Sequence, residues 1–208
     1  FLDKIPTQTS MVLFLGQMIH ETISEHLSLE EIQSLGCLHD MFREIWRKNK
    51  RKMSWDGEYN FEKEEEIDAG KKGLRMLEHF YNSQFNCKPK SNEQSVTKEI
   101  MGDIPFIGRV DRVENFKNGT RIVDYKTGKL NTRFLDTFQL EVYAWLSYRD
   151  EEPVVSAGYY FLEADRFLDI EFDSKQYTKT QLTIEKKTAL LMQSMKKGDL
   201  KPKQSNLC

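Results

Sequence analysis

The sequence predicts an α/β protein in which one central mixed β-sheet is flanked by helices and preceded by an N-terminal helical elaboration. Apolar residues recur with a helical period over roughly the first 90 positions. Beyond them the apolar residues alternate as in strands, and a helical segment interrupts the strands. With 208 residues the chain is long enough for one full core. We therefore expect a single domain over residues 1–208, with a mainly helical part at 1–90 and an αβ core at 91–208.

Three helices are expected before residue 90. Their expected bounds are about 7–27, 28–52 and 61–85. The start of the second helix rests on Ser28 with Glu31, which form a capping-box pattern. This helix ends in the basic run 47–52, which either grips phosphates or is a solvated helix end. A loop over residues 88–93 then leads into the strands.

The αβ core is expected to contain five strands and two helices. The strands are expected at 95–101, 104–114, 120–126, 154–162 and 167–172, and the helices at 136–148 and 174–195. Asn118-Gly119, between the second and third strands, is the strongest short hairpin signal. A two-residue turn there places Asp111 opposite Lys126. Because alternate residues share a face, Asp111, Asp124 and Lys126 should then converge within roughly 5–8 Å.

Two carboxylates beside an ammonium on one sheet face indicate a site for a hard cation and a phosphate. Mg²⁺ binds through one or two carboxylates plus substrate phosphates, so Asp111 and Asp124 are the candidate ligands. The alternative is a pair of exposed strand acids, which is unfavourable because Asp is depleted in strands. Glu99 is a weaker third carboxylate, and we expect Arg109 and Arg112 to point away from the metal face.

Composition limits the class of protein only loosely. The net charge of −2 gives no overall basic footprint, but an acidic metal site and a basic rim would cancel in that sum. Three widely spaced cysteines do not suggest a disulfide framework, so a reducing, cytoplasmic location is expected. No apolar run is long enough for a membrane span, and no signal peptide is evident, so no membrane partner is expected.

Four motifs follow one another along the chain. They are Gly16-x-x-x-His20, Gly108-Arg109-Val110-Asp111-Arg112-Val113, Asp124-Tyr125-Lys126-Thr127-Gly128 and Gln139-x-x-x-Tyr143. In this order they resemble the RecB-type branch of the PD-(D/E)xK nuclease superfamily, which includes helicase-associated and CRISPR-associated adaptation nucleases. The resemblance covers residues 16–143 and implies a restriction-endonuclease-like fold and nuclease activity.

The resemblance also implies roles for single residues. His20 would bind a second metal ion or contact the scissile phosphate, and the carbonyl of Tyr125 would add a metal ligand. Lys126 would hold the attacking water and stabilise charge in the transition state. Gln139 and Tyr143, which share a helix face, would contact the nucleic-acid backbone or orient the site. The structural alternatives are that His20 is a packed residue, that Lys126 is a surface lysine paired across the hairpin, and that Tyr143 is a core tyrosine.

The implied function is a Mg²⁺- or Mn²⁺-dependent deoxyribonuclease, an exonuclease of DNA repair, recombination or CRISPR adaptation. Its expected partners are single-stranded DNA or duplex ends, with a helicase or another nuclease subunit. Two alternatives stay open. One is a catalytically silent nucleic-acid-binding or scaffolding module, against which the complete Asp/Asp/Lys set argues. The other is an RNA-processing enzyme with the same chemistry.

Many members of this branch hold an iron–sulfur cluster on four cysteines, one before the histidine helix and three beyond the last helix. In this chain no cysteine precedes His20, and Cys208 is the last residue. Four thiolates are normally needed, so the chain as given cannot bind a cluster. Because it begins at Phe1 rather than Met, we expect a fragment of a longer protein and a cluster only in that longer chain.

Overall fold

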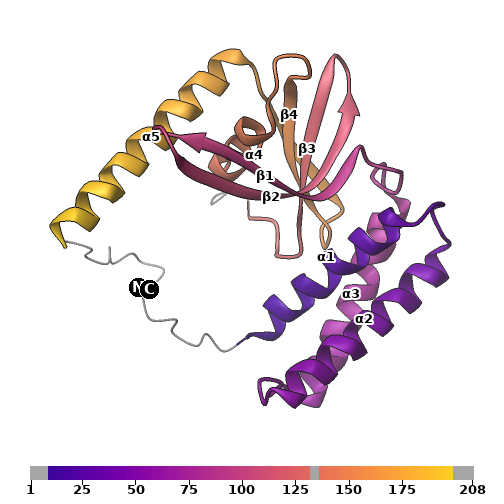
Figure 1. Ribbon diagram of the computed structural model, residues 1–208. Coiled ribbons are helices and arrows are strands. Elements are labelled where there is room, and N and C mark those ends of the chain that lie inside the picture. The colour runs from indigo at the N-terminus through magenta and orange to yellow at the C-terminus, as the bar shows by residue number, and fades with distance from the viewer. Residues whose placement is uncertain (1–8, 132–135, 199–208) are drawn as a thin grey trace.

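The computed structural model describes residues 9–131 and 136–198, which form five helices and five strands (Figure 1). The helices are α1 (Met11–Ser28), α2 (Leu35–Trp55), α3 (Lys63–Asn82), α4 (Phe138–Ser147) and α5 (Ser174–Lys197). The strands are β1 (Ser91–Ile100), β2 (Ile104–Phe116), β3 (Gly119–Lys126), β4 (Val154–Phe161) and β5 (Arg166–Glu171). The order of helices and strands is the one predicted from the sequence. None of the described helices is long and apolar enough to cross a membrane.

The five strands form one sheet in the order β1-β2-β3-β4-β5. Neighbouring strands are antiparallel except β3 and β4, which are parallel, so the predicted mixed sheet is confirmed. A parallel pair needs a crossover connection, and the segment that contains α4 supplies it. This connection places α4 on the sheet beside the end of β3.

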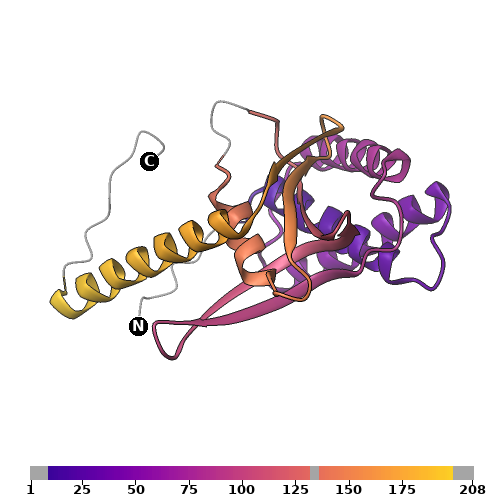
Figure 2. The ribbon, with the colours of Figure 1, turned by 90° about the horizontal axis from the view of Figure 1, so that it is seen from above.

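Helices cover both faces of the sheet (Figures 1 and 2). One face packs on α1, α2 and α3 through Val123, Tyr125 and Tyr160. The other face packs on α4 and on the first half of α5, for example through Ile122 and Tyr159. The N-terminal helices therefore share one hydrophobic core with the sheet.

The second helix starts later than the capping-box pattern predicts. Ser28 is the last residue of α1, and its hydroxyl donates to the carbonyl of Ser24. The helix α2 instead begins at Leu35, where the side chain of Ser34 accepts a hydrogen bond from the backbone N–H of Cys37. The capping-box prediction was wrong because the Ser28 hydroxyl is bonded within the preceding helix.

The β2–β3 turn lies one residue earlier than Asn118-Gly119 predicts. Phe116 pairs with Gly119, so Lys117 and Asn118 form the turn, and Lys117 takes a left-handed φ of +49°. The predicted register was therefore wrong by two residues. Because side chains alternate with a period of two, such a shift does not exchange the faces.

Strand β2 separates from β3 at Asp111. The last β2–β3 pair is Arg112 with Val123, and beyond it β2 pairs with β1 alone. Asp111 Oδ2 accepts a hydrogen bond of 2.8 Å from the backbone N–H of Tyr125. Figure 2 shows β1 and β2 continuing away from β3 as a two-stranded arm. The Asp111 carboxylate thus lies at the fork between β2 and β3.

Candidate active site

Three side chains from separate elements meet near the fork. One ligand atom from each of His20, Glu93 and Asp111 lies within 4.8 Å of the other two. His20 Nδ1 is 3.4 Å from Asp111 Oδ2 and 3.9 Å from Glu93 Oε1. Two carboxylates and one imidazole form a donor set that suits Mg²⁺ or Mn²⁺. We call this set the metal-ligand cluster.

Glu93 was not expected to belong to the site, and Glu99 was the predicted third carboxylate. β1 begins at Ser91, four residues earlier than expected, so Glu93 lies in the strand and not in a loop. The pairs on either side of Glu93 place it opposite Asp111, whereas Glu99 pairs with Pro105 near the far end of the hairpin. The polar residues around Glu93 show no strand-like alternation, and this residue takes a φ of +48°. No local pattern therefore marks Glu93 as a strand residue.

Asp124 lies beside the metal-ligand cluster without belonging to it. Its side chain is 6% exposed, and Oδ2 lies 2.8 Å from Lys126 Nζ. Burial and then the negative charge of Asp111 raise the pKa of Asp124 to about 6, although Lys126 acts in the opposite direction. Burial and repulsion from Asp111 therefore both disfavour the ionised form of Asp124.

The Lys126 ammonium is held from three sides. Besides its ion pair with Asp124, Nζ donates a hydrogen bond of 2.9 Å to Oε1 of Gln139. It also lies 4.7 Å from the centre of the Tyr159 ring. The Tyr159 hydroxyl in turn donates to the carbonyl of Asp136. Lys126 thus pairs with Asp124 and not with Asp111, its predicted partner.

Gln139 and Tyr143 share one face of α4, as predicted. Nε2 of Gln139 donates to the Tyr143 hydroxyl at 3.0 Å. Burial first, and then the charges of Asp124, Asp111 and Glu93, raise the pKa of Tyr143. Contact of these residues with nucleic acid stays a prediction. The hydrogen bond from Lys126 to Gln139 is consistent with the other expected role, in which these residues orient the site, and that role also stays a prediction.

Tyr125 contributes to the site through its backbone. Its ring is buried among α1–α3, and its N–H holds the Asp111 carboxylate. Use of its carbonyl as a metal ligand stays a prediction. Arg109 contradicts the expectation that it points away from the metal face, because it pairs with Glu93. Arg112 does lie on the opposite face, fully buried and paired with Glu114.

A cleft of about 510 Å³ opens onto the metal-ligand cluster. It is lined by Gln17, His20, Glu21, Ser24, Glu25, Glu93, Arg109, Asp111 and Tyr143. The helix α1 supplies five of these residues, and the other four come from β1, β2 and α4. The cleft gives a solvent-side ligand direct access to the carboxylates.

Two motif glycines allow close packing around the site. A Cβ at Gly16 would lie 3.2 Å from the Thr127 hydroxyl, so the absence of a side chain lets α1 approach the loop after Lys126. A Cβ at Gly108 would lie 2.5 Å from a methyl group of Leu146, so β2 can pack directly on α4. Both glycines therefore serve the geometry that brings α1, β2 and α4 together.

Three acids surround His20. Burial alone would lower its pKa, but the contact with Asp111 and the charges of Asp111, Asp124 and Glu93 outweigh burial and raise it. Burial and the charge of Asp111 likewise raise the pKa of Glu93, against the effect of Arg109. A bound cation would relieve this repulsion and displace the proton from His20.

We expect Asp124→Asn to stabilise the metal-free protein above about pH 6. The folded-state pKa of Asp124, about 6, lies above its ordinary value of 3.8, so ionisation of Asp124 favours unfolding. This cost is absent below about pH 4, grows as pH rises, and reaches roughly 2–3 kcal/mol above pH 6. Urea denaturation in EDTA at several pH values would measure it. Asp103→Asn at the β1–β2 hairpin is the control, and a variant advantage that does not grow with pH would contradict the prediction.

The cysteines bear on the iron–sulfur prediction only in part. Cys37 and Cys87 are free and exposed. Cys208 lies outside the described residues, so the structure does not test the expectation of a cluster in a longer chain.

A family model described as the PD-(D/E)XK nuclease superfamily matches residues 2–208. A search of curated proteins finds no significant match. Among solved structures, a protein from Eubacterium rectale described as a candidate exonuclease matches with a TM-score of 0.58 and 12% identity. The match covers 99% of this chain and 74% of that one. At this identity the likeness shows the fold alone.

A further solved structure, of the protein SSO0001, has 18% identity and a TM-score of 0.33. The match covers 86% of this chain and 89% of that one, but the score is too low to support an argument.

Proposed function

Because this chain belongs to the PD-(D/E)XK nuclease superfamily, we propose that it is a metal-dependent nuclease that hydrolyses DNA phosphodiester bonds. One observation carries the proposal: the metal-ligand cluster lines an open cleft, and the Asp124–Lys126 ion pair lies next to that cluster. The residues that could hold a cation thus lie close to the Lys126 ammonium, which could interact with the reacting phosphate. This combination is what phosphodiester hydrolysis requires.

The donor set fits a divalent cation. His20, Glu93 and Asp111 would hold it, and Asp124 would add a carboxylate from the neighbouring strand. The pKa of Asp124, which burial and then the charge of Asp111 raise, supports this assignment, because a bound cation would favour the ionised carboxylate that both disfavour. When bound, such a cation polarises the phosphate and lowers the pKa of a coordinated water molecule.

Lys126 would act electrostatically in this reaction. Its ammonium, next to the Asp124 carboxylate and fixed by Gln139, can orient the attacking water and stabilise negative charge that develops on the phosphate. Asp111, anchored by the N–H of Tyr125, keeps its second oxygen available to a cation. Arg109, at the cleft wall, is placed to contact a neighbouring phosphate.

The finer parts of the proposal rest on the motifs. We propose the RecB-type branch, exonuclease action, and a role in DNA repair, recombination or CRISPR adaptation with a helicase or nuclease-complex partner. The description of the Eubacterium rectale protein as a candidate exonuclease supports the exonuclease mode only by analogy of fold. A cytoplasmic location is proposed from the cysteine pattern alone.

We expect EDTA to abolish cleavage of end-labelled DNA, and Mn²⁺ or Mg²⁺ to restore it. The reason is that in the proposed mechanism the two carboxylates and His20 act by holding the cation. Product lengths would distinguish exonuclease from endonuclease action, and labelled RNA of the same sequence would test the RNA alternative. Cleavage that survives chelation would contradict the metal mechanism. No cleavage under any metal would favour the silent binding module.

A further inference from the structure

Helix α5 concentrates positive charge in a chain whose net charge is −2. Its 24 residues contain six lysines and one glutamate, so the helix carries +5 while the remaining residues together carry −7. Only Thr180 and Ile184 of the helix are buried. The charge is therefore displayed on a helix that is mostly exposed.

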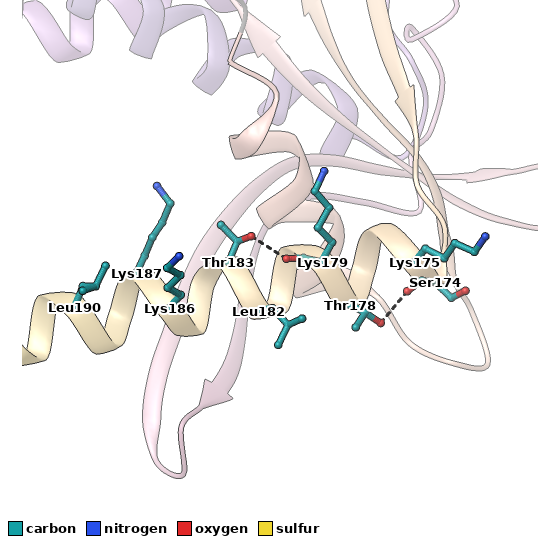
Figure 3. Close-up of a pocket in the computed structure, with 9 residues that line it drawn as sticks. All are labelled: Ser174, Lys175, Thr178, Lys179, Leu182, Thr183, Lys186, Lys187 and Leu190. Atoms are coloured by element: carbon teal, nitrogen blue, oxygen red, sulfur yellow. Dashed lines mark hydrogen bonds between the residues drawn. The ribbon is translucent and has the colours of Figure 1, made fainter.

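Four of these lysines lie on one face. Lys175, Lys179, Lys186 and Lys187, which we call the lysine face, are all exposed (Figure 3). Thr178 and Thr183 lie between these lysines, and their hydroxyls donate to carbonyls of their own helix. The face is an open surface of one helix and not an enclosed cavity.

The α5 lysines share one property, which is that they have no acidic partner among the residues that the structure describes. Within residues 9–131 and 136–198, no carboxylate lies within 4 Å of an α5 ammonium. By contrast, Lys48, Lys50, Lys71 and Lys72 on α2 and α3 each have a carboxylate partner. Unpaired cations on one face suit a polyanionic ligand, because each lysine that neutralises a phosphate releases a counterion condensed on the nucleic acid.

The lysine face adjoins the candidate active site. Lys187 Nζ lies 4.9 Å from the centre of the Phe138 ring, and the next residue, Gln139, accepts the hydrogen bond from Lys126. From Lys187 to Lys175 the face extends about 18 Å at 1.5 Å per residue. That length corresponds to roughly five nucleotides of a duplex strand.

We propose that the lysine face of α5 binds the nucleic-acid backbone outside the active site and so favours substrates long enough to reach it. The inference rests on the proposed function, because it gives the path of that substrate. The exposed Leu182 and Leu190 on the same face also suit a protein partner. The two occupants are separable, since only a nucleic acid gives binding that depends on strand length and on salt through these lysines.

The test compares wild type with a fourfold variant, Lys175→Gln, Lys179→Gln, Lys186→Gln and Lys187→Gln. Gln keeps helix propensity close to that of Lys, so α5 should persist. The control is Lys63→Gln, Lys71→Gln, Lys90→Gln and Lys117→Gln, which removes four exposed lysines elsewhere. A second variant with Arg at the four α5 positions retains the charge and should behave like wild type.

Affinity for single-stranded DNA of about 6 and about 30 nucleotides is measured in EDTA over a range of salt. For the long strand we expect the Gln variant to bind about tenfold more weakly, with a log–log salt slope shallower by about 2–3. The short strand and the control variant should show little change. Equal salt slopes in the variant and the control would overturn the inference while leaving the proposed function intact. A wild type that neither binds nor cleaves DNA would overturn the proposed function itself.

Discussion

Replacing Asp111 with asparagine is expected to lower DNA cleavage by about a thousandfold or more while leaving the fold intact. Asp111 belongs to the metal-ligand cluster and lies closest to His20. An asparagine oxygen can still accept the hydrogen bond from the Tyr125 N–H, so the fork between β2 and β3 should persist. The substitution therefore removes the charge that binds the cation and little else.

Two measurements test this expectation. Cleavage of labelled DNA with Mn²⁺ reports activity, and titration calorimetry with Mn²⁺ reports metal affinity. Asp103→Asn, an exposed acid at the tip of the same hairpin, is the matched control and should match wild type in both. If Asp111→Asn bound Mn²⁺ and cleaved DNA like the control, the metal-ligand cluster would not be the active centre.

Glu93 was found from the structure and not from a motif, so it marks a part of the site that could not be predicted from the sequence. Motif residues are predictable because several residues with linked structural roles lie close together in the sequence. Gly16 is an example, since its lack of a side chain lets α1 approach Thr127. Glu93 has no such context: it follows a loop, and its strand shows no alternation. Only the long-range pairing of β1 with β2 brings it to Asp111, and a single sequence does not reveal that pairing.

The fold was predictable where the period of apolar residues is strong. The order of helices and strands follows from it, and the fold class is confirmed. Local sequence patterns gave wrong predictions where the same residues could form two different structures. The Ser28 hydroxyl bonds within α1 and not to the start of α2, and the turn uses Lys117 with Asn118 although Asn118-Gly119 is the stronger signal. Interactions across the sheet decide such choices.

Lys126→Met is expected to lower cleavage by about a hundred- to a thousandfold while Mn²⁺ still binds. Methionine fills nearly the same space beside Tyr159 and Gln139 but has no charge for the reacting phosphate. Loss of the ammonium also removes the cation nearest to Asp124, so the affinity for a divalent cation should not fall. This retained affinity distinguishes Lys126 from Asp111, whose replacement should abolish both activity and binding.

Gln139→Ala should have a smaller effect than Lys126→Met, because Gln139 orients the Lys126 ammonium without supplying charge. We expect a loss of about tenfold, similar to that of one hydrogen bond to a charged group. Calorimetry with Mn²⁺ and single-turnover cleavage on the same preparations would rank the variants. If Lys126→Met cleaved DNA as well as Gln139→Ala, the lysine would serve only to pair with Asp124. The charge stabilising the transition state would then have to come from another group, and Arg109 at the cleft wall would be the next residue to test.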